Sequence, residues 1–164
     1  MKKFWIVLMV AVIAVTGCGN NNSVSKEDET KEVSGYTFSF NGTDLNMNQK
    51  VSDVVDKLGK YEYFEAKSCA FEGLDKTYTY SDFVLYTYPI DGVDYLSGIS
   101  LKSDLVETKE GVCIGQTKEN IESAYGKDGK ESEGSITYTD GKSQLQFVLE
   151  DNVITGIEYI AITE

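Results

Sequence analysis

The same succession of sequence patterns occurs twice between Gly35 and Glu164, and this repeat limits the possible folds more than any other feature. Each copy has an amphipathic stretch that ends at a glycine, Gly59 in the first copy and Gly126 in the second. A Thr-Tyr-Thr triplet follows in both, at 77–79 and at 137–139. A repeated order of elements favours an internal duplication over chance similarity. One such unit buries too little apolar surface to be stable, whereas two can share a core.

Each copy is expected to open with a helix. Apolar side chains three and four residues apart form one stripe on a helix. The stripe of the first helix consists of Val51, Val54, Val55 and Leu58, and that of the second consists of Ile121, Ala124 and Tyr125. Asn48 and Thr117 are suitable N-caps, and glycine suits the C-terminal end of a helix because it tolerates positive φ.

The remaining segments are expected to be strands, because they are short, rich in aromatic and β-branched residues, and bounded by turns. A first hairpin pairs 36–40 with 43–47 across Asn41-Gly42, a strong signal for a type I′ turn. The further strands are 61–64, 77–80, 83–88 and 95–101 in the first copy and 137–139, 145–149 and 154–159 in the second. Pro89 with Asp91-Gly92, Asp140-Gly141 and 150–152 are expected to form turns.

These patterns predict an α+β fold. Two tandem repeats, each a helix followed by an antiparallel meander, would form a sheet with helices on one face. The first repeat spans 35–103 and the second 104–164.

The N-terminus has the parts of an export signal. Lys2 and Lys3 precede an apolar run at 4–15, which is too short to cross a bilayer comfortably. The following Val-Thr-Gly-Cys resembles the lipobox of bacterial lipoproteins. The resemblance implies cleavage after residue 17 and acylation of Cys18, with the protein held by its acyl chains on the extracytoplasmic face of the cell membrane. An ordinary signal peptide with a chance cysteine, or a retained anchor, is the alternative.

Residues 18–34 then read as a lipidated N-terminus followed by a flexible linker, because they contain too few apolar residues to fold. Removal of the signal would leave 13 lysines against 27 acidic residues, a charge of −14. The chain has no arginine, so nucleic acid is not an expected partner.

The absence of histidine from the chain limits catalysis. Ser-His-Asp and Cys-His catalysis and imidazole zinc sites are excluded. The sequence has no EF-hand loop and no glycine-rich phosphate loop. We therefore expect no enzyme, no cofactor and no bound metal.

The repeated helix-glycine elements ending at Gly59 and Gly126, with their following strands, carry a second resemblance. From Gly35 to Glu164 the pattern is similar to the tandem α/β repeats of the beta-lactamase inhibitor protein and of small outer-membrane assembly lipoproteins. The resemblance implies a sheet whose open face binds a protein partner.

Two cysteines remain besides Cys18. In an exported protein, Cys69 and Cys113 suggest a disulfide, and two separate buried thiols are the alternative.

Tyrosine is abundant, with 11 residues in the chain. Tyr86 and Tyr88 share one side of a strand, and Phe83 and Leu85 share the other. Tyr78, Tyr80, Tyr86 and Tyr88 are therefore candidates for a binding face, although tyrosine also suits strands for structural reasons.

The expected function is a membrane-tethered, non-catalytic binding module for a protein or an envelope component. A structural or assembly role in the cell envelope is the alternative.

Overall fold

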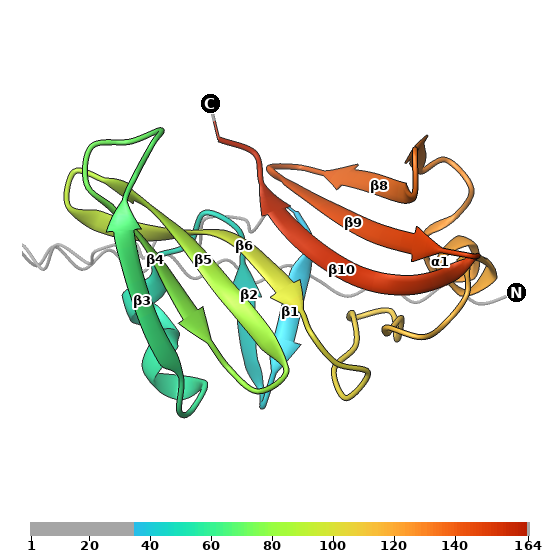
Figure 1. Ribbon diagram of the computed structural model, residues 1–164, viewed down its shortest axis with the longest axis horizontal. Coiled ribbons are helices and arrows are strands. Elements are labelled where there is room, and N and C mark those ends of the chain that lie inside the picture. Colours follow the sequence, from blue (N-terminus) through green and yellow to red (C-terminus); the bar gives the residue numbers. More distant parts are fainter. Residues whose placement is uncertain (1–34, 164) are drawn as a thin grey trace, which may run out of the picture. The chain divides into compact units, whose positions relative to one another are not determined.

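The computed structural model describes residues 35–163. The expected signal peptide, Cys18 and the linker lie outside these residues. The described part contains a two-stranded hairpin and an eight-stranded antiparallel sheet (Figure 1). The hairpin consists of β1 (Thr37–Phe40) and β2 (Thr43–Asn46). The strands of the large sheet are β3 (Glu62–Lys67), β4 (Leu74–Thr79), β5 (Phe83–Ile90), β6 (Val93–Leu101), β7 (Lys130–Ser132), β8 (Ser135–Asp140), β9 (Ser143–Glu150) and β10 (Val153–Ala161).

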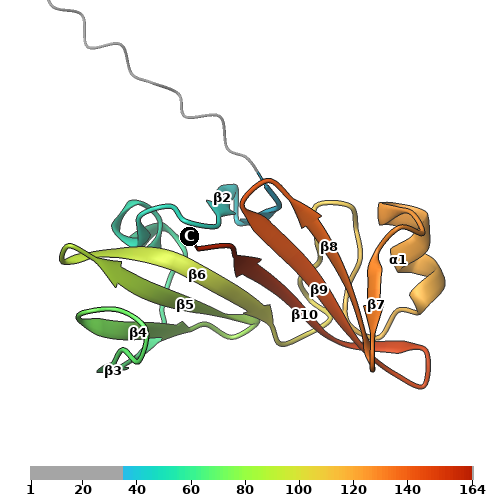
Figure 2. The same ribbon diagram turned by 90° about the horizontal axis from the view of Figure 1, so that it is seen from above.

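The large sheet is built from two meanders. Its strand order is β3-β4-β5-β6-β10-β9-β8-β7, so each group of four consecutive strands forms one half. The halves join where β6 pairs with β10, from Ile157 opposite Leu101 to Ile160 opposite Gly98 (Figure 2). β3 and β7 are therefore the two edges of the sheet.

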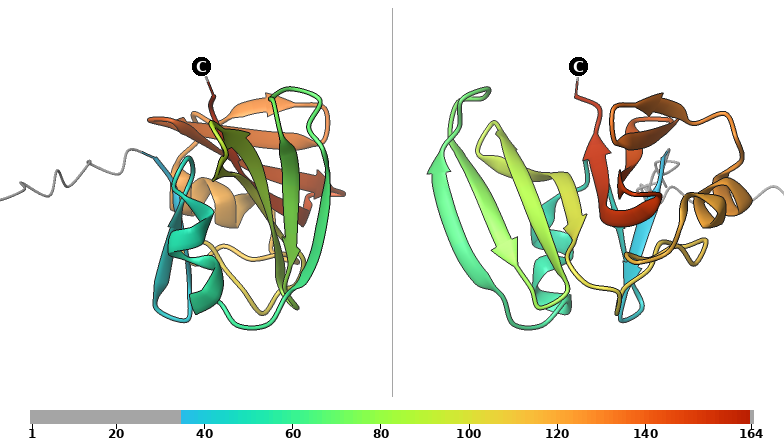
Figure 3. Two further views of the ribbon diagram at one scale, coloured as in Figure 1. Left: turned by 90° about the vertical axis from the view of Figure 1, so that its left-hand side faces the viewer. Right: turned by 45° about the vertical axis from the view of Figure 1, so that its right-hand side comes forward.

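The expected α+β class is wrong, because strands dominate the described residues. The helical elements are the 3₁₀-helices η1 (Val51–Asp53) and η2 (Val55–Lys57) and the α-helix α1 (Lys118–Tyr125), which has eight residues. These short elements do not form the helical layer that was predicted. The central cover of the sheet is instead the hairpin β1–β2, which lies on the same side of the sheet as η1 and η2 (Figure 3).

The structure has two 3₁₀-helices, η1 and η2, in place of the first predicted helix, and the local sequence accounts for the difference. Three of its four apolar positions are valine, whose branched side chain has a lower helix propensity. The backbone of Val54 leaves helical geometry at φ −127°, and no side chain caps the start at Lys50. The predicted stripe is nevertheless buried in the core.

The hairpin connects both halves of the sheet to one core. Phe38 and Leu45 are fully buried. The ring of Phe38 packs at 5.2 Å from Phe83 in β5 and at 5.8 Å from Tyr159 in β10. The described core residues lie within residues 32–164, which form one compact unit of the chain.

Most predicted turns are confirmed. Asn41 and Gly42 both have positive φ, as a type I′ turn requires, and so do Asp151 and Asn152. Three residues of the predicted turns lie in strands instead: Pro89 in β5, Asp140 in β8 and Glu150 in β9. The turns fall on 91–92, 141–142 and 151–152. In the part of the chain that the structure describes, no helix is long and apolar enough to cross a membrane.

Candidate binding surface

The two faces of the large sheet differ in what covers them. One face carries the core, including Leu85, Ile99 and Ile157. Strand alternation places every second residue on the opposite face, which we call the open face. The strand registers place on it, among others, Glu62, Phe64, Thr77, Thr79, Val84, Tyr86, Ser100, Thr137, Gln144, Gln146, Glu158 and Ile160. None of these twelve residues is buried.

The open face is poor in charge. Glu62 and Glu158 are the only charged residues among these twelve, and the registers add Asp75 and Lys130 to the same face, whereas residues 35–163 contain 22 acidic residues and 11 lysines. Hydroxyl and amide side chains predominate, and Gln146 donates a hydrogen bond to Thr137 at 3.2 Å. The largest apolar groups are Phe64, 66% exposed, and Tyr86, 42% exposed. The surface therefore combines aromatic area with neutral hydrogen-bonding groups.

The predicted tyrosine face is mostly wrong. Tyr86 and Tyr88 do share the side of β5 opposite Phe83 and Leu85. Tyr78, however, pairs with Leu85 on the core face, and both Tyr78 and Tyr80 are buried in the core. Only Tyr86 of the four candidates is exposed.

Tyr88 is buried although it points away from the core face, because a loop covers it. Its ring lies 5.1 Å from Phe71, in the loop between β3 and β4, and 5.9 Å from Tyr95. Its hydroxyl donates a 2.8 Å hydrogen bond to Asn48 Oδ1. Only 7% of Tyr88 is exposed, and burial raises the pKa of its hydroxyl. Tyr88 is thus a structural residue.

Tyr86 lies against a glycine. A Cβ atom at Gly98, opposite Tyr86 in the register, would meet the Tyr86 ring at 3.7 Å and the Tyr159 carbonyl oxygen at 3.1 Å. The glycine therefore lets an aromatic ring lie close to the backbone of β6. Phe64, the most exposed aromatic of the open face, was missed at the sequence level, although its place in the expected strand 61–64 was a usable signal.

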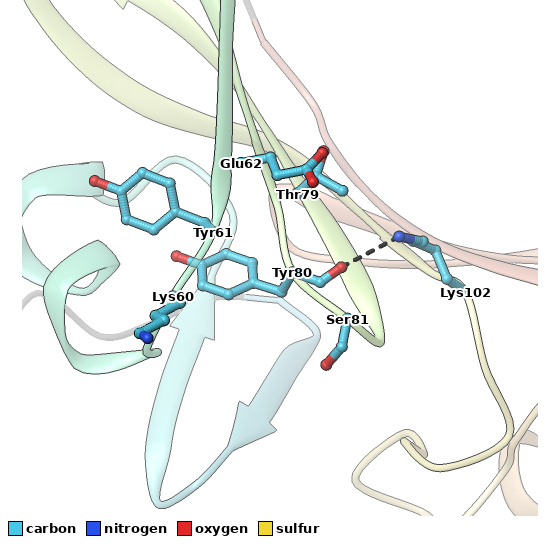
Figure 4. Close-up of a pocket in the computed structure, with 7 residues that line it drawn as sticks. All are labelled: Lys60, Tyr61, Glu62, Thr79, Tyr80, Ser81 and Lys102. Atoms are coloured by element: carbon cyan, nitrogen blue, oxygen red, sulfur yellow. Dashed lines mark hydrogen bonds between the residues drawn. The ribbon is translucent and has the colours of Figure 1, made fainter.

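A pocket of about 400 Å³ adjoins the open face at the start of β3 (Figure 4). It shares Glu62 and Thr79 with that face, and its other lining residues are Lys60, Tyr61, Tyr80, Ser81 and Lys102. Lys102 Nζ donates to the Tyr80 carbonyl oxygen at 3.2 Å. The rings of Tyr61 and Tyr80 lie 5.7 Å apart. The pocket is thus lined by the exposed ring of Tyr61 and by the side chains of Lys60 and Lys102.

The hydroxyl groups of this pocket are held in hydrogen bonds within the domain. The Tyr80 hydroxyl donates to the Val55 carbonyl oxygen at 3.3 Å, and burial raises the pKa of Tyr80 to about 12. The Ser81 hydroxyl donates to the Asp82 carboxylate at 2.6 Å, and Ser103 donates to the same carboxylate at 2.8 Å. These hydrogen bonds lower the pKa of Asp82, which makes it a poor base for activating a serine.

In two other pockets, a polar group of the lining is already bonded to another side chain of the domain. One, of about 440 Å³, lies beside η1 and η2 and includes Asp94, whose carboxylate holds the Lys76 ammonium at 2.7 Å. The other, of about 250 Å³, lies beside α1 and includes Glu110, which accepts a hydrogen bond from the Tyr125 hydroxyl. Burial and this hydrogen bond raise the pKa of Tyr125. Within residues 35–163, no group of three or more His, Cys, Asp and Glu side chains lies together as a metal site would require.

The predicted disulfide is not formed in this structure. Cys69 is an exposed free thiol in the loop after β3, and Cys113 is a half-buried free thiol before α1. Burial raises the pKa of the Cys113 thiol. The alternative of separate thiols fits the structure better, although Cys69 is not buried.

Comparison of the chain with models of known protein families, with characterised proteins and with solved structures finds no match. The resemblances to the lipobox and to the tandem-repeat family remain predictions from the sequence.

Proposed function

We propose that this protein is a lipid-anchored, extracytoplasmic binding module without catalytic activity, and that the open face is its contact surface. One observation carries the proposal: twelve unburied residues of a single sheet face combine Phe64 and Tyr86 with neutral polar groups in a strongly acidic domain.

The composition of the open face supports a role in recognition. The cores of protein interfaces are enriched in aromatic residues and depleted of charged ones. Tyrosine supplies a large contact area at low entropic cost, and hydroxyl and amide groups supply adaptable hydrogen bonds. The face offers both, on strands held rigidly by the core behind them. Its partner is thus expected to be a protein or envelope component with a largely neutral, hydrogen-bonding surface.

The N-terminal sequence supports the tether. Acyl chains on Cys18 would anchor the protein, and the polar residues after it would act as a flexible spacer. Such a spacer would let the open face reach a partner at some distance from the membrane.

The test is affinity capture from envelope and secreted fractions with immobilised residues 32–164. Tyr86→Ala combined with Gln146→Ala removes contact groups from the centre of the open face without touching the core. We expect a captured partner to bind at least tenfold more weakly to this variant, because buried interface tyrosines are frequent hot spots. Leu105→Ala is the control, since Leu105 lies in a loop and is 81% exposed. A partner held equally by all three proteins would refute the open face as the contact surface.

A further inference from the structure

The two edges of the large sheet differ in how well they are protected. β7 has only three residues, and short edge strands are one way in which proteins prevent unwanted pairing. β3 has six residues, all exposed, and forms the opposite border of the sheet (Figure 1). An edge strand of this length is a template for a further strand.

The backbone of β3 has free groups in a regular pattern. Ser68 N–H donates to the Gly73 carbonyl oxygen at 3.0 Å, which continues the pairing of β3 with β4. Hydrogen bonding alternates along an antiparallel strand, so even-numbered residues bond to β4. The N–H and C=O groups of Tyr63, Glu65 and Lys67 therefore point away from the sheet.

Aromatic side chains flank these free groups on both sides of the sheet. Phe64 lies on the open face, and Tyr63, 48% exposed, lies on the other. Tyr63 packs at 5.4 Å from Tyr78, and its hydroxyl donates to Glu65. An added strand would thus gain apolar contacts as well as backbone hydrogen bonds.

We propose that the added strand is β3 of a second copy of this chain, paired antiparallel about a two-fold axis perpendicular to the sheet. Such an axis keeps both open faces on the same side, so residues that face each other must both be even-numbered or both odd-numbered. Only two registers then pair five residues of β3. One places Phe64 opposite the partner's Phe64, and the other places Glu65 opposite the partner's Glu65.

Charge selects the first register. Like charges directly opposite each other destabilise an antiparallel pair, whereas aromatic pairs stabilise it. In the Phe64 register, Tyr63 faces Glu65 and Glu62 faces Ala66, so no like charges meet. Just beyond the strand, Tyr61 faces Lys67. The two Phe64 residues form a pair without mutual hydrogen bonds, in which Cα atoms approach to about 4.5 Å.

The net charge of the domain opposes this association, so the affinity of the dimer should depend on salt concentration. Residues 32–164 carry 24 acidic residues against 11 lysines, so two copies repel each other at low salt. Salt screens repulsion between exposed charges over about 8 Å at physiological ionic strength. The dimer therefore becomes tighter as salt is raised from low to physiological concentration.

The test is sedimentation velocity of residues 32–164 over a range of concentrations and salt. Phe64→Lys places two ammonium groups across the two-fold axis and weakens the dimer at least tenfold. Leu105→Lys, which makes the same change of charge at an exposed loop position, leaves the dimer intact. Far-ultraviolet circular dichroism establishes that both variants keep the fold.

Disulfide trapping tests the register separately. In a background of Cys69→Ser and Cys113→Ser, Phe64→Cys oxidises to a covalent dimer, because the expected Cα separation lies within disulfide range. Glu65→Cys gives little dimer in this register. Rapid crosslinking of Glu65→Cys alone would overturn the register.

A wild-type domain that stays monomeric up to about 1 mM, where binding contributes only about 4 kcal/mol, would overturn the dimer. A monomer in which Phe64→Lys abolishes binding of a different protein would also overturn it and assign the β3 edge to that protein. The open-face test uses Tyr86 and Gln146, so its failure is distinguishable from failure of self-pairing.

Discussion

Tyr86 and Tyr88 point to the same side of β5 but have opposite roles. Tyr88 is covered by Phe71 and is hydrogen bonded to Asn48, whereas Tyr86 is 42% exposed. Tyr88→Ala removes a buried ring and should lower the free energy of unfolding by about 3–5 kcal/mol. Tyr86→Ala should lower it by about 1 kcal/mol, since it removes only a half-exposed contact. Urea unfolding of both variants measures the difference, and equal losses would show that Tyr88 is not held as described.

The sequence could predict which of these side chains share a face, but not which are covered. Strand alternation depends only on residue spacing, and it placed Tyr86 and Tyr88 correctly on one side of β5. Burial of Tyr88 depends on Phe71, 17 positions earlier, in a loop whose path has no sequence periodicity. Tyr78 and Tyr80 were misassigned because tyrosine suits both a core and a recognition surface.

At the scale of the element, the sequence was more informative about strands than about helices. Alternating residues such as 83–88 and 154–159 predicted β5 and β10 within a few positions. The stripe at 51–58 was ambiguous, because apolar residues three apart line one side of a 3₁₀-helix as well as an α-helix. β7 was not predicted, since Lys-Glu-Ser has no apolar alternation.

The end of β4 is expected to be sensitive to alkaline pH. Burial raises the pKa of Tyr80 from 10.0 to about 12, so the folded state keeps a proton that the unfolded state loses first. The stabilisation is therefore complete below pH 10 and is lost as the pH rises from 10 to about 12. Tyr80→Phe should flatten this pH dependence, after a constant loss of about 1 kcal/mol for the hydrogen bond to Val55. Urea unfolding across this pH range is the measurement, and an unchanged slope in the variant would contradict the assignment.

At the scale of the whole molecule, the repeated order of patterns was a useful guide to the strands but a poor guide to what covers the sheet. Two similar meanders are present, yet a hairpin that belongs to neither occupies the centre of the core. Its own sequence predicted the hairpin. Its position over both meanders depends on long-range packing of Phe38 and Leu45, which local patterns do not encode.

This shared core predicts that the first repeat cannot fold alone. A fragment of residues 35–103 keeps the hairpin and β3 to β6, but it exposes the edge of β6 that pairs with β10 and the side of Phe38 that packs against Tyr159. The fragment also lacks several fully buried side chains, including Ile154, Ile157 and Tyr159. Truncating any one of them in the whole domain would lower the free energy of unfolding by about 2–5 kcal/mol. A domain of this size has a total stability of about 5–15 kcal/mol, so the fragment should be unfolded. Residues 32–164 should instead unfold in a single cooperative transition by circular dichroism and by tyrosine fluorescence. A cooperative transition in the isolated fragment would show that each meander has a core of its own.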